Sequence, residues 1–443
     1  MKKNKIYIIG IGGIGISAIA RYYLHVGYEV FGSDSTGSEL ITTLISEGVN
    51  IYIGERPEII SREFEKIIYT EAIPSSQSEL SYAIKSQVPT FTYPQALADI
   101  ANRKKLIAVS GTHGKSTTTS FTSIVLKDSE YSVNAVIGTI LKEFGGKNAY
   151  FSESNYFAIE ACEYKRSFLQ YKPYIALITN IEIDHLDYYK DLDDYISAYD
   201  DFISNVQTNG YVILNGDDIN CKKLLNKRND VQYIEVFNEY YTLENKKTYF
   251  ADLNLQIPGD HILFDAHLAY ITGQIIGVPE KEIIKSLEQY NGVWRRMEEI
   301  GTTKQGNILL SDYGHHPTEI QLTLDSVKQK YAGRKIRTVF QPHQYNRTIE
   351  LLEGFKKSFG NTDYLIIPNI YESRDSIVDK ENMSTQKLLD SIKHNNKQNG
   401  YGLKNTLSLL TKYEEQNQND SIILLLGAGD VDNLRYDIPI RKS

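Results

Sequence analysis

Short apolar runs rich in β-branched residues, each followed by a longer amphipathic segment, recur along the whole chain. In the first hundred residues these runs occupy 6–9, 28–31, 49–53, 67–70 and 89–92. The alternation starts again at 106–109, and a third time with runs at 308–310, 336–340, 364–367 and 422–426. Strands that alternate with helix-length segments are typical of βαβ units on a parallel sheet. The sequence therefore predicts three α/β blocks, with bounds expected at 1–101, 102–293 and 294–443.

Composition sets limits on the class of protein. The chain has 443 residues, of which 41% are apolar, so each of three domains can have its own core. The net charge is −8 without long basic blocks, which argues against a nucleic-acid interface. Two cysteines cannot supply a disulfide framework or a four-thiolate zinc site. No cleavage pattern follows the start, and the longest apolar runs are strand-length. We expect a cytoplasmic monomer or homodimer that binds neither nucleic acid nor membrane.

A glycine-rich turn directly follows the first strand. Gly10, Gly12, Gly13 and Gly15 open the next helix, and Asp34 ends the second strand. Such a turn allows close backbone approach and places a helix N-terminus against a diphosphate. A nicotinamide dinucleotide and a UDP-sugar both satisfy this requirement, and a turn of this kind can also serve tight packing alone. The turn by itself therefore leaves the ligand open.

A second glycine-containing loop, SGTHGKST at 110–117, lies between a strand and a helix rich in threonine and serine. Its backbone N–H groups suit phosphate, Lys115 neutralises the β- and γ-phosphates, and the Ser116 hydroxyl can bind Mg²⁺. The loop is shorter than the full Walker pattern, because Val109 stands where that pattern has glycine. We assign ATP binding in this loop to Gly111, Thr112, His113, Gly114, Lys115, Ser116 and Thr117.

Acidic and histidine residues follow the next two strands of this block. Glu160 ends one strand, and His185 follows the strand at 174–180. Ligands of open α/β sheets gather at the carboxyl ends of strands, so both side chains are expected to face the triphosphate. Oxygen ligands suit Mg²⁺, and a histidine ligand also admits Mn²⁺. Taken singly, Glu160 can equally be a solvated cap and His185 a surface ion-pair member. We expect metal binding by Ser116, Glu160 and His185.

The last block carries a further set of polar residues after its strands. Asp312 and His315 follow one strand, and His343 and Arg347 follow the next. Histidine and arginine donors suit anionic oxygens. Histidines at such positions can also serve core hydrogen bonds, and Arg347 a surface salt bridge. Arg296, at the start of the block, is a cation that domain closure could bring to phosphate.

Together these motifs resemble the Mur ligase family, the ATP-dependent amide ligases that build the peptidoglycan stem peptide. The motifs occur in order as GIGGIG at 10–15, SGTHGKST at 110–117, EACEY at 160–164, TNIEIDH at 179–185, DYGHHPTE at 312–319, FQPHQYNRT at 340–348 and GAGD at 427–430. They cover nearly the whole chain and are most similar to the branch that couples L-alanine. The resemblance implies a Rossmann-like N-terminal domain for the UDP-sugar, a central P-loop-type ATPase domain and a C-terminal Rossmann-like domain for the amino acid.

The resemblance also implies an activity. The lactoyl carboxylate of UDP-N-acetylmuramate attacks the γ-phosphorus of ATP, and L-alanine then displaces phosphate from the acyl phosphate. Ser116 and Glu160 would bind one Mg²⁺, and His185 a second. Catalytic roles are implied for Lys115, Glu160, His185, His343 and Arg347. Further nucleotide contacts are implied for Arg296 and Asp312. Binding of the other substrates is implied for Gly10, Gly12, Gly13, Gly15, Asp34 and His315.

The chain departs from the family pattern at three places. Family members commonly have asparagines that read adenine where this chain has Ile262, whose side chain cannot hydrogen-bond, and Asp265, which only accepts hydrogen bonds when ionised. Cys162 stands where many members have aspartate, and Gly314 where alanine is usual. Three alternatives stay open: a recycling ligase that adds a preformed tripeptide, a nicotinamide-dependent oxidoreductase built on the first turn, and a binding protein without activity.

Overall fold

The computed structural model describes residues 4–373, 375–416 and 421–441. It divides into two compact units. One unit contains the chain up to Asp184, with Tyr188–Asn254 and Phe264–Tyr290. The other contains His185–Asp187, Leu255–Leu263 and the chain from Asn291 onward. Within the described ranges, no helix combines the length and the apolar character that a membrane crossing needs.

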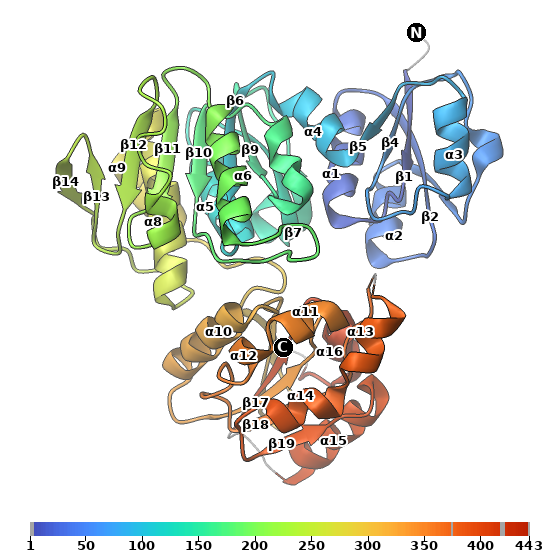
Figure 1. Ribbon diagram of the computed structural model, residues 1–443, viewed down its shortest axis with the longest axis vertical. Coiled ribbons are helices and arrows are strands. Elements are labelled where there is room, and N and C mark those ends of the chain that lie inside the picture. The colour runs from blue at the N-terminus through green and yellow to red at the C-terminus, as the bar shows by residue number, and fades with distance from the viewer. Residues whose placement is uncertain (1–3, 374, 417–420, 442–443) are drawn as a thin grey trace. The chain divides into compact units, whose positions relative to one another are not determined.

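The first sheet is wholly parallel, with strand order β3-β2-β1-β4-β5. All five predicted strands are confirmed. The strands are β1 (Lys5–Ile9), β2 (Glu29–Asp34), β3 (Asn50–Ile53), β4 (Phe64–Tyr69) and β5 (Thr90–Thr92). The helices that pack on this sheet are α1 (Ile14–His25), α2 (Glu39–Ser46), α3 (Ser78–Lys85) and α4 (Tyr93–Ala101), with a short turn η1 (Pro57–Ile59). Figure 1 shows this sheet in blue.

The central sheet has nine strands in the order β14-β13-β12-β11-β10-β6-β9-β7-β8. The strands are β6 (Lys105–Ser110), β7 (Asn134–Leu141), β8 (Lys147–Tyr150), β9 (Tyr156–Glu160), β10 (Ile175–Ile178), β11 (Tyr211–Asn215), β12 (Gln232–Val236), β13 (Tyr240–Leu243) and β14 (Lys246–Tyr249). Six of them form a parallel core, and antiparallel strands flank that core: β8 at one edge and the β13–β14 hairpin at the other.

Helices cover the central sheet on both faces (Figure 1). They are α5 (Lys115–Lys127), α6 (Leu192–Ser204), α7 (Ile219–Lys222), α8 (Asp260–Ile276) and α9 (Glu280–Glu288), with the turns η2 (Lys142–Phe144) and η3 (Tyr164–Gln170). The first and central sheets share one hydrophobic cluster, which includes Ile6 and Ile8 of β1 as well as Leu106 and Ala108 of β6. Helix α1 contacts β7 and β8, so the two sheets are fixed to each other within this unit.

The third sheet forms the core of the second unit, with strand order β15-β16-β20-β17-β18-β19. The strands are β15 (Glu298–Thr302), β16 (Ile308–Asp312), β17 (Lys335–Phe340), β18 (Tyr364–Ile367), β19 (Lys397–Asn399) and β20 (Ser421–Leu426). Only β15 runs antiparallel among them. The helices are α10 (Pro317–Lys330), α11 (Tyr345–Glu350), α12 (Leu352–Phe355), α13 (Ile377–Asn382), α14 (Thr385–Ser391), α15 (Leu403–Gln416) and α16 (Leu434–Asp437), with η4 (Asp430–Asn433). The predicted class, three α/β blocks with mainly parallel sheets, is confirmed.

Candidate active site

The glycine-containing loop at 110–117, which the sequence predicts to bind phosphate and which we call the phosphate loop, connects β6 to α5 as expected. Gly111 has φ +133° and Gly114 has φ +81°, a region that favours glycine. A Cβ at position 111 would lie 2.0 Å from Oγ1 of Thr179, and one at position 114 would lie 2.6 Å from Oδ1 of Asp265. The loop therefore needs glycine at both positions, because neighbouring segments pack directly against its backbone.

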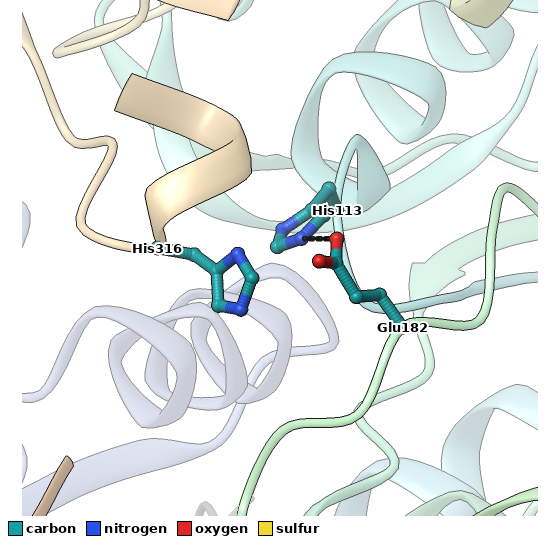
Figure 2. A group of neighbouring side chains, drawn as sticks. All are labelled: His113, Glu182 and His316. Atoms are coloured by element: carbon teal, nitrogen blue, oxygen red, sulfur yellow. Dashed lines mark hydrogen bonds and ion pairs between the residues drawn. The ribbon is translucent and has the colours of Figure 1, made fainter. Parts of the chain in front are cut away.

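The end of β10 holds the phosphate loop in place. The Thr112 N–H donates to the Asn180 carbonyl at 3.1 Å, and the His113 N–H donates to Oδ1 of Asn180 at 3.0 Å. The Thr112 hydroxyl donates to the Glu182 carbonyl at 2.7 Å. The side chain of His113 lies 3.2 Å from the Glu182 carboxylate, as Figure 2 shows. These bonds hold the loop in its conformation through contacts within the protein.

Lys115 begins α5 and turns its ammonium back into the loop. Its Nζ lies 3.1 Å from Oε2 and 3.2 Å from Oε1 of Glu163, and 3.1 Å from the Thr112 carbonyl. Burial opposes the charge on Lys115, but the Glu163 carboxylate outweighs burial and raises the pKa of the lysine above its ordinary value. Lys115 is therefore a permanent cation at the phosphate loop. Sequence reasoning missed Glu163.

Glu160 lies at the same edge of the sheet. It ends β9, and its partner across the sheet is Val109, just before the loop. Its Oε1 accepts a hydrogen bond from the Gly138 N–H at 2.6 Å, which orients the carboxylate. The Glu160 carboxylate and the Ser116 hydroxyl are hard oxygen ligands, so the chemistry of this donor set fits Mg²⁺. His185 has φ +56° and belongs to the segment that groups with the second unit, so its metal role stays a prediction.

A pocket of about 850 Å³ opens beside the first glycine-rich turn. Gly10, Gly13 and Asp34 line it, whereas Gly12 and Gly15 do not. The Gly12 N–H donates to Oδ2 of Asp34 at 2.9 Å. Asp34 thus supports the turn as well as lining the pocket. Helix α1 has no acidic residue in its first turn, which leaves its N-terminus suited to an anion.

Glu79 also lines this pocket, and sequence reasoning missed it. It is 1% exposed and accepts hydrogen bonds from the Tyr7 hydroxyl at 2.8 Å, the Ser33 hydroxyl at 2.7 Å and the Arg56 N–H at 2.8 Å. Its carboxylate therefore ties β1, β2 and the segment after β3 together around the pocket. Only the folded chain brings these donors to one carboxylate, so no motif in the sequence signals this role.

In the second unit, Asp312 organises the loop that follows β16. It is 4% exposed and accepts hydrogen bonds from the Met297 N–H at 2.8 Å and the Gly314 N–H at 2.7 Å. Burial raises the pKa of Asp312. Arg296 lies 3.3 Å from the carboxylate of Glu319. Contacts of Asp312 and Arg296 with nucleotide stay predictions.

Three histidines of the second unit, His315, His316 and His343, follow the carboxyl ends of β16 and β17, the two strands that flank β20. The rings of His315 and His343 lie 6.0 Å apart, and His343 stacks on Tyr371 at 5.4 Å. Arg347 is on α11, which follows the His343 segment. His316, drawn in Figure 2, caps α10, and its Nδ1 accepts from the Thr318 N–H at 3.3 Å. The structure thus brings His315 and His343 together, while their substrate roles stay predictions.

Three family models match successive parts of the chain. "Mur ligase family, catalytic domain" matches residues 5–105, "Mur ligase middle domain" matches 109–277, and "Mur ligase, glutamate ligase domain" matches 295–429. The chain is 35% identical over 445 residues to a UDP-N-acetylmuramate–L-alanine ligase of Clostridium acetobutylicum, covering 97% of this chain and 96% of that protein. It is 36% identical over 449 residues to the enzyme of the same name from Clostridium novyi, covering 97% and 95%.

Solved structures share the fold. The UDP-N-acetylmuramate-alanine ligase of Thermotoga maritima has a TM-score of 0.79 at 24% identity, covering 98% of this chain and 97% of that chain. A murein peptide ligase of Psychrobacter arcticus has a TM-score of 0.73 at 21% identity, covering 98% of both chains. With the three matched models and the long alignments to its relatives, this chain belongs to the Mur ligase family.

Proposed function

We propose that this chain joins L-alanine to the lactoyl carboxylate of UDP-N-acetylmuramate at the expense of ATP, a step of peptidoglycan precursor synthesis. Relatives with 35% and 36% identity over 97% of the chain bear the name of that activity. The structural observation that supports it best is the cationic Lys115, partly buried in the phosphate loop that follows β6, whose neighbouring strand β9 ends at Glu160. A dinucleotide oxidoreductase has no use for this second loop.

The reaction proceeds in two steps. A carboxylate oxygen of the sugar bonds to the γ-phosphorus of ATP, and the bond from that phosphorus to the β-γ bridging oxygen breaks, which releases ADP. The amine of L-alanine then bonds to the acyl carbon, loses a proton, and phosphate leaves. Both partners of the first step are anions, so electrostatic stabilisation must provide most of the barrier reduction. Lys115 and the backbone N–H groups of the loop supply fixed positive charge where the phosphoryl group transfers.

Mg²⁺ would be held by Ser116 and Glu160, and His185 is the proposed ligand of a second ion. Bound metal ions would neutralise part of the phosphate charge. Gly138 keeps the Glu160 carboxylate oriented through the 2.6 Å hydrogen bond to Oε1. We propose that the pocket lined by Gly10, Gly13 and Asp34 takes the UDP-sugar, with the diphosphate at the N-terminus of α1.

We further propose that the third sheet carries the amino-acid site. His343 and Arg347 would contact the reacting carboxylate and the acyl phosphate, and His315 the incoming amine. Arg296 and Asp312 would contribute to nucleotide binding. The domain bounds 1–101, 102–293 and 294–443 belong to the same proposal.

An acceptor comparison tests the function. The purified full chain is mixed with ATP, Mg²⁺ and UDP-N-acetylmuramate, and ADP release is measured with L-alanine and, separately, with the tripeptide L-alanyl-γ-D-glutamyl-diaminopimelate. We expect ADP release with L-alanine. Release with the tripeptide alone would assign the chain to the recycling reaction. In a parallel assay with added NAD(P)H, a change in its absorbance without ATP consumption would overturn both assignments.

A further inference from the structure

The ammonium of Lys115 has a complete set of partners inside its own loop. An ammonium has three protons, and here they face the Gly111 carbonyl, the Thr112 carbonyl at 3.1 Å and the Glu163 carboxylate at 3.1–3.2 Å. Glu163 is 1% exposed, and the Lys115 side chain is 18% exposed. A carboxylate this deeply buried is stable only with a paired charge and hydrogen bonds. Lys115 and Glu163 are thus fixed as a pair.

Three tyrosines surround the Glu163 end of this pair. The Tyr195 hydroxyl donates to Oε1 of Glu163 at 3.3 Å, and the Tyr189 hydroxyl donates to the Glu163 carbonyl. The Tyr199 hydroxyl donates to the Tyr195 oxygen at 3.4 Å. All three side chains are at most 1% exposed. Buried aromatic side chains have few alternative rotamers, so the Tyr195 hydroxyl holds the Glu163 carboxylate and the Tyr189 hydroxyl holds its backbone carbonyl, whereas Tyr199 contacts only Tyr195.

The network returns to the phosphate loop. The Tyr195 hydroxyl also lies 3.2 Å from the Thr112 hydroxyl, while the Thr112 carbonyl accepts from Lys115. Thr112, Tyr195, Glu163 and Lys115 therefore form a ring of close contacts, in which Thr112 and Tyr195 pack against each other while their hydroxyl protons are donated to the Glu182 carbonyl and to Glu163. A shift of any one member moves the others, because each contact shares an atom or a side chain with the next.

We propose that Glu163 is a positioning residue for Lys115, and that Tyr195 fixes Glu163 in turn. The role rests on the proposed ATP-dependent ligation. When a triphosphate enters the loop, the ammonium exchanges its carbonyl partners for phosphate oxygens, while Glu163 keeps Nζ within reach of the transferring group. Glu163 itself contacts no substrate. Its contribution is geometric, so its loss should affect turnover more than nucleotide binding.

Steady-state kinetics with matched variants test this role. Glu163→Gln keeps the shape but removes the charge, and we expect kcat to fall about 10–100-fold with the KM for ATP changed less than about threefold. Glu163→Asp restores the carboxylate and should recover part of kcat. Tyr195→Phe should also lower kcat. Tyr199→Phe is the control, since this equally buried hydroxyl lies one turn further along α6 and one hydrogen bond further from the carboxylate.

A second readout does not depend on turnover. In ¹⁵N-lysine-labelled protein, a buried hydrogen-bonded ammonium exchanges slowly and gives a side-chain NMR signal, assigned here by its loss in Lys115→Arg. We expect that signal in the wild type, in Tyr199→Phe and in Glu163→Asp, and its loss in Glu163→Gln. Persistence of the signal in Glu163→Gln, or equal loss of kcat in Tyr195→Phe and Tyr199→Phe, would overturn the proposal. An inactive wild type that keeps the signal would instead reject the proposed function alone.

Discussion

Arg21 links the first and central sheets, and its replacement by methionine should destabilise the first unit. The residue is on α1 and is 6% exposed. Its Nε lies 2.8 Å from Oε2 of Glu47, its Nη2 lies 3.2 Å from Oε1, and its Nη1 donates to Oδ1 of Asn148 on β8. Asn148 in turn donates to the Ser17 hydroxyl at 3.0 Å. Methionine preserves much of the aliphatic stem but makes none of these polar contacts.

The size of the effect follows from what the substitution leaves behind. Removing one partner of a buried ion pair costs about 3–5 kcal/mol, because the other charge stays desolvated. Glu47 is 14% exposed and keeps a contact with Lys147 at 3.3 Å, so the low end, about 3 kcal/mol, applies. Adding Glu47→Gln removes the remaining charge. We expect the double variant to recover about 1–2 kcal/mol relative to the sum of the two single variants.

Urea unfolding measures these free energies with two probes. Far-UV circular dichroism reports on the whole chain, whereas Trp294, the single tryptophan, belongs to the second unit. Arg21→Met should move the circular dichroism midpoint to lower urea, with a smaller shift in Trp294 fluorescence. The reasoning would be refuted if the free energy of unfolding of Arg21→Met lay within about 0.5 kcal/mol of the wild-type value. It would also be refuted if the losses in the two single variants simply added up in the double variant.

Three further substitutions probe the loop and a buried histidine. Lys115→Ala should lower ADP formation by at least about 10²-fold, and equal rates in variant and wild type would contradict the assigned role. Gly114→Ala meets Asp265 at 2.6 Å and a backbone φ of +81°, so calorimetry should show a loss of about 1–3 kcal/mol together with weaker ATP binding; unchanged melting would argue against the strained loop. Burial lowers the pKa of His267, stacked on Phe250 at 3.8 Å, to about 4. The unfolded chain therefore binds the proton first, and stability falls as pH drops from about 6.5 towards 4, by about 2 kcal/mol at pH 5. Urea unfolding at pH 7.5 and 5.0 should show this loss in the wild type and a smaller one in His267→Gln.

The fold was predictable wherever strands are apolar and end in glycine or polar residues. The strands of the first sheet and the parallel strands β6, β9, β16, β17, β18 and β20 all coincide with apolar runs. The β13–β14 hairpin has no such signal, because apart from Leu243 its residues are tyrosines, threonines and lysines, half-exposed in β13 and mostly exposed in β14. These two strands form because β13 pairs with β12 and with β14, and such pairing leaves no pattern in the local sequence.

The candidate site was likewise predictable only in part. Lys115 and Glu160 could be assigned to one site because the Lys115 loop follows a predicted strand, Glu160 ends another, and ligands gather at the carboxyl ends of strands. The structure shows that these two strands, β6 and β9, are neighbours. Glu163 and Tyr195 could not be assigned in this way, since 32 positions separate them in the chain and only the packing of α6 brings them into contact. The residues proposed to bind ligand were recognised from their motifs, whereas the positioning role proposed for Glu163, although it stands in the EACEY motif, became visible only through tertiary contacts.

The same backbone arrangement occurs at the carboxyl edge of all three sheets. A glycine with positive φ follows β1, β6 and β20, at Gly10 (+74°), Gly111 (+133°) and Gly427 (+140°). In each case a Cβ would strike the chain that leaves the neighbouring strand: Thr70 after β4 at 2.3 Å, Thr179 after β10 at 2.0 Å, and Gln341 after β17 at 2.5 Å. Close approach of two strand ends draws a polar loop from each onto one edge. The three sheets thus each present a preformed loop pair, which suits a reaction that must hold a nucleotide sugar, a triphosphate and an amino acid at once.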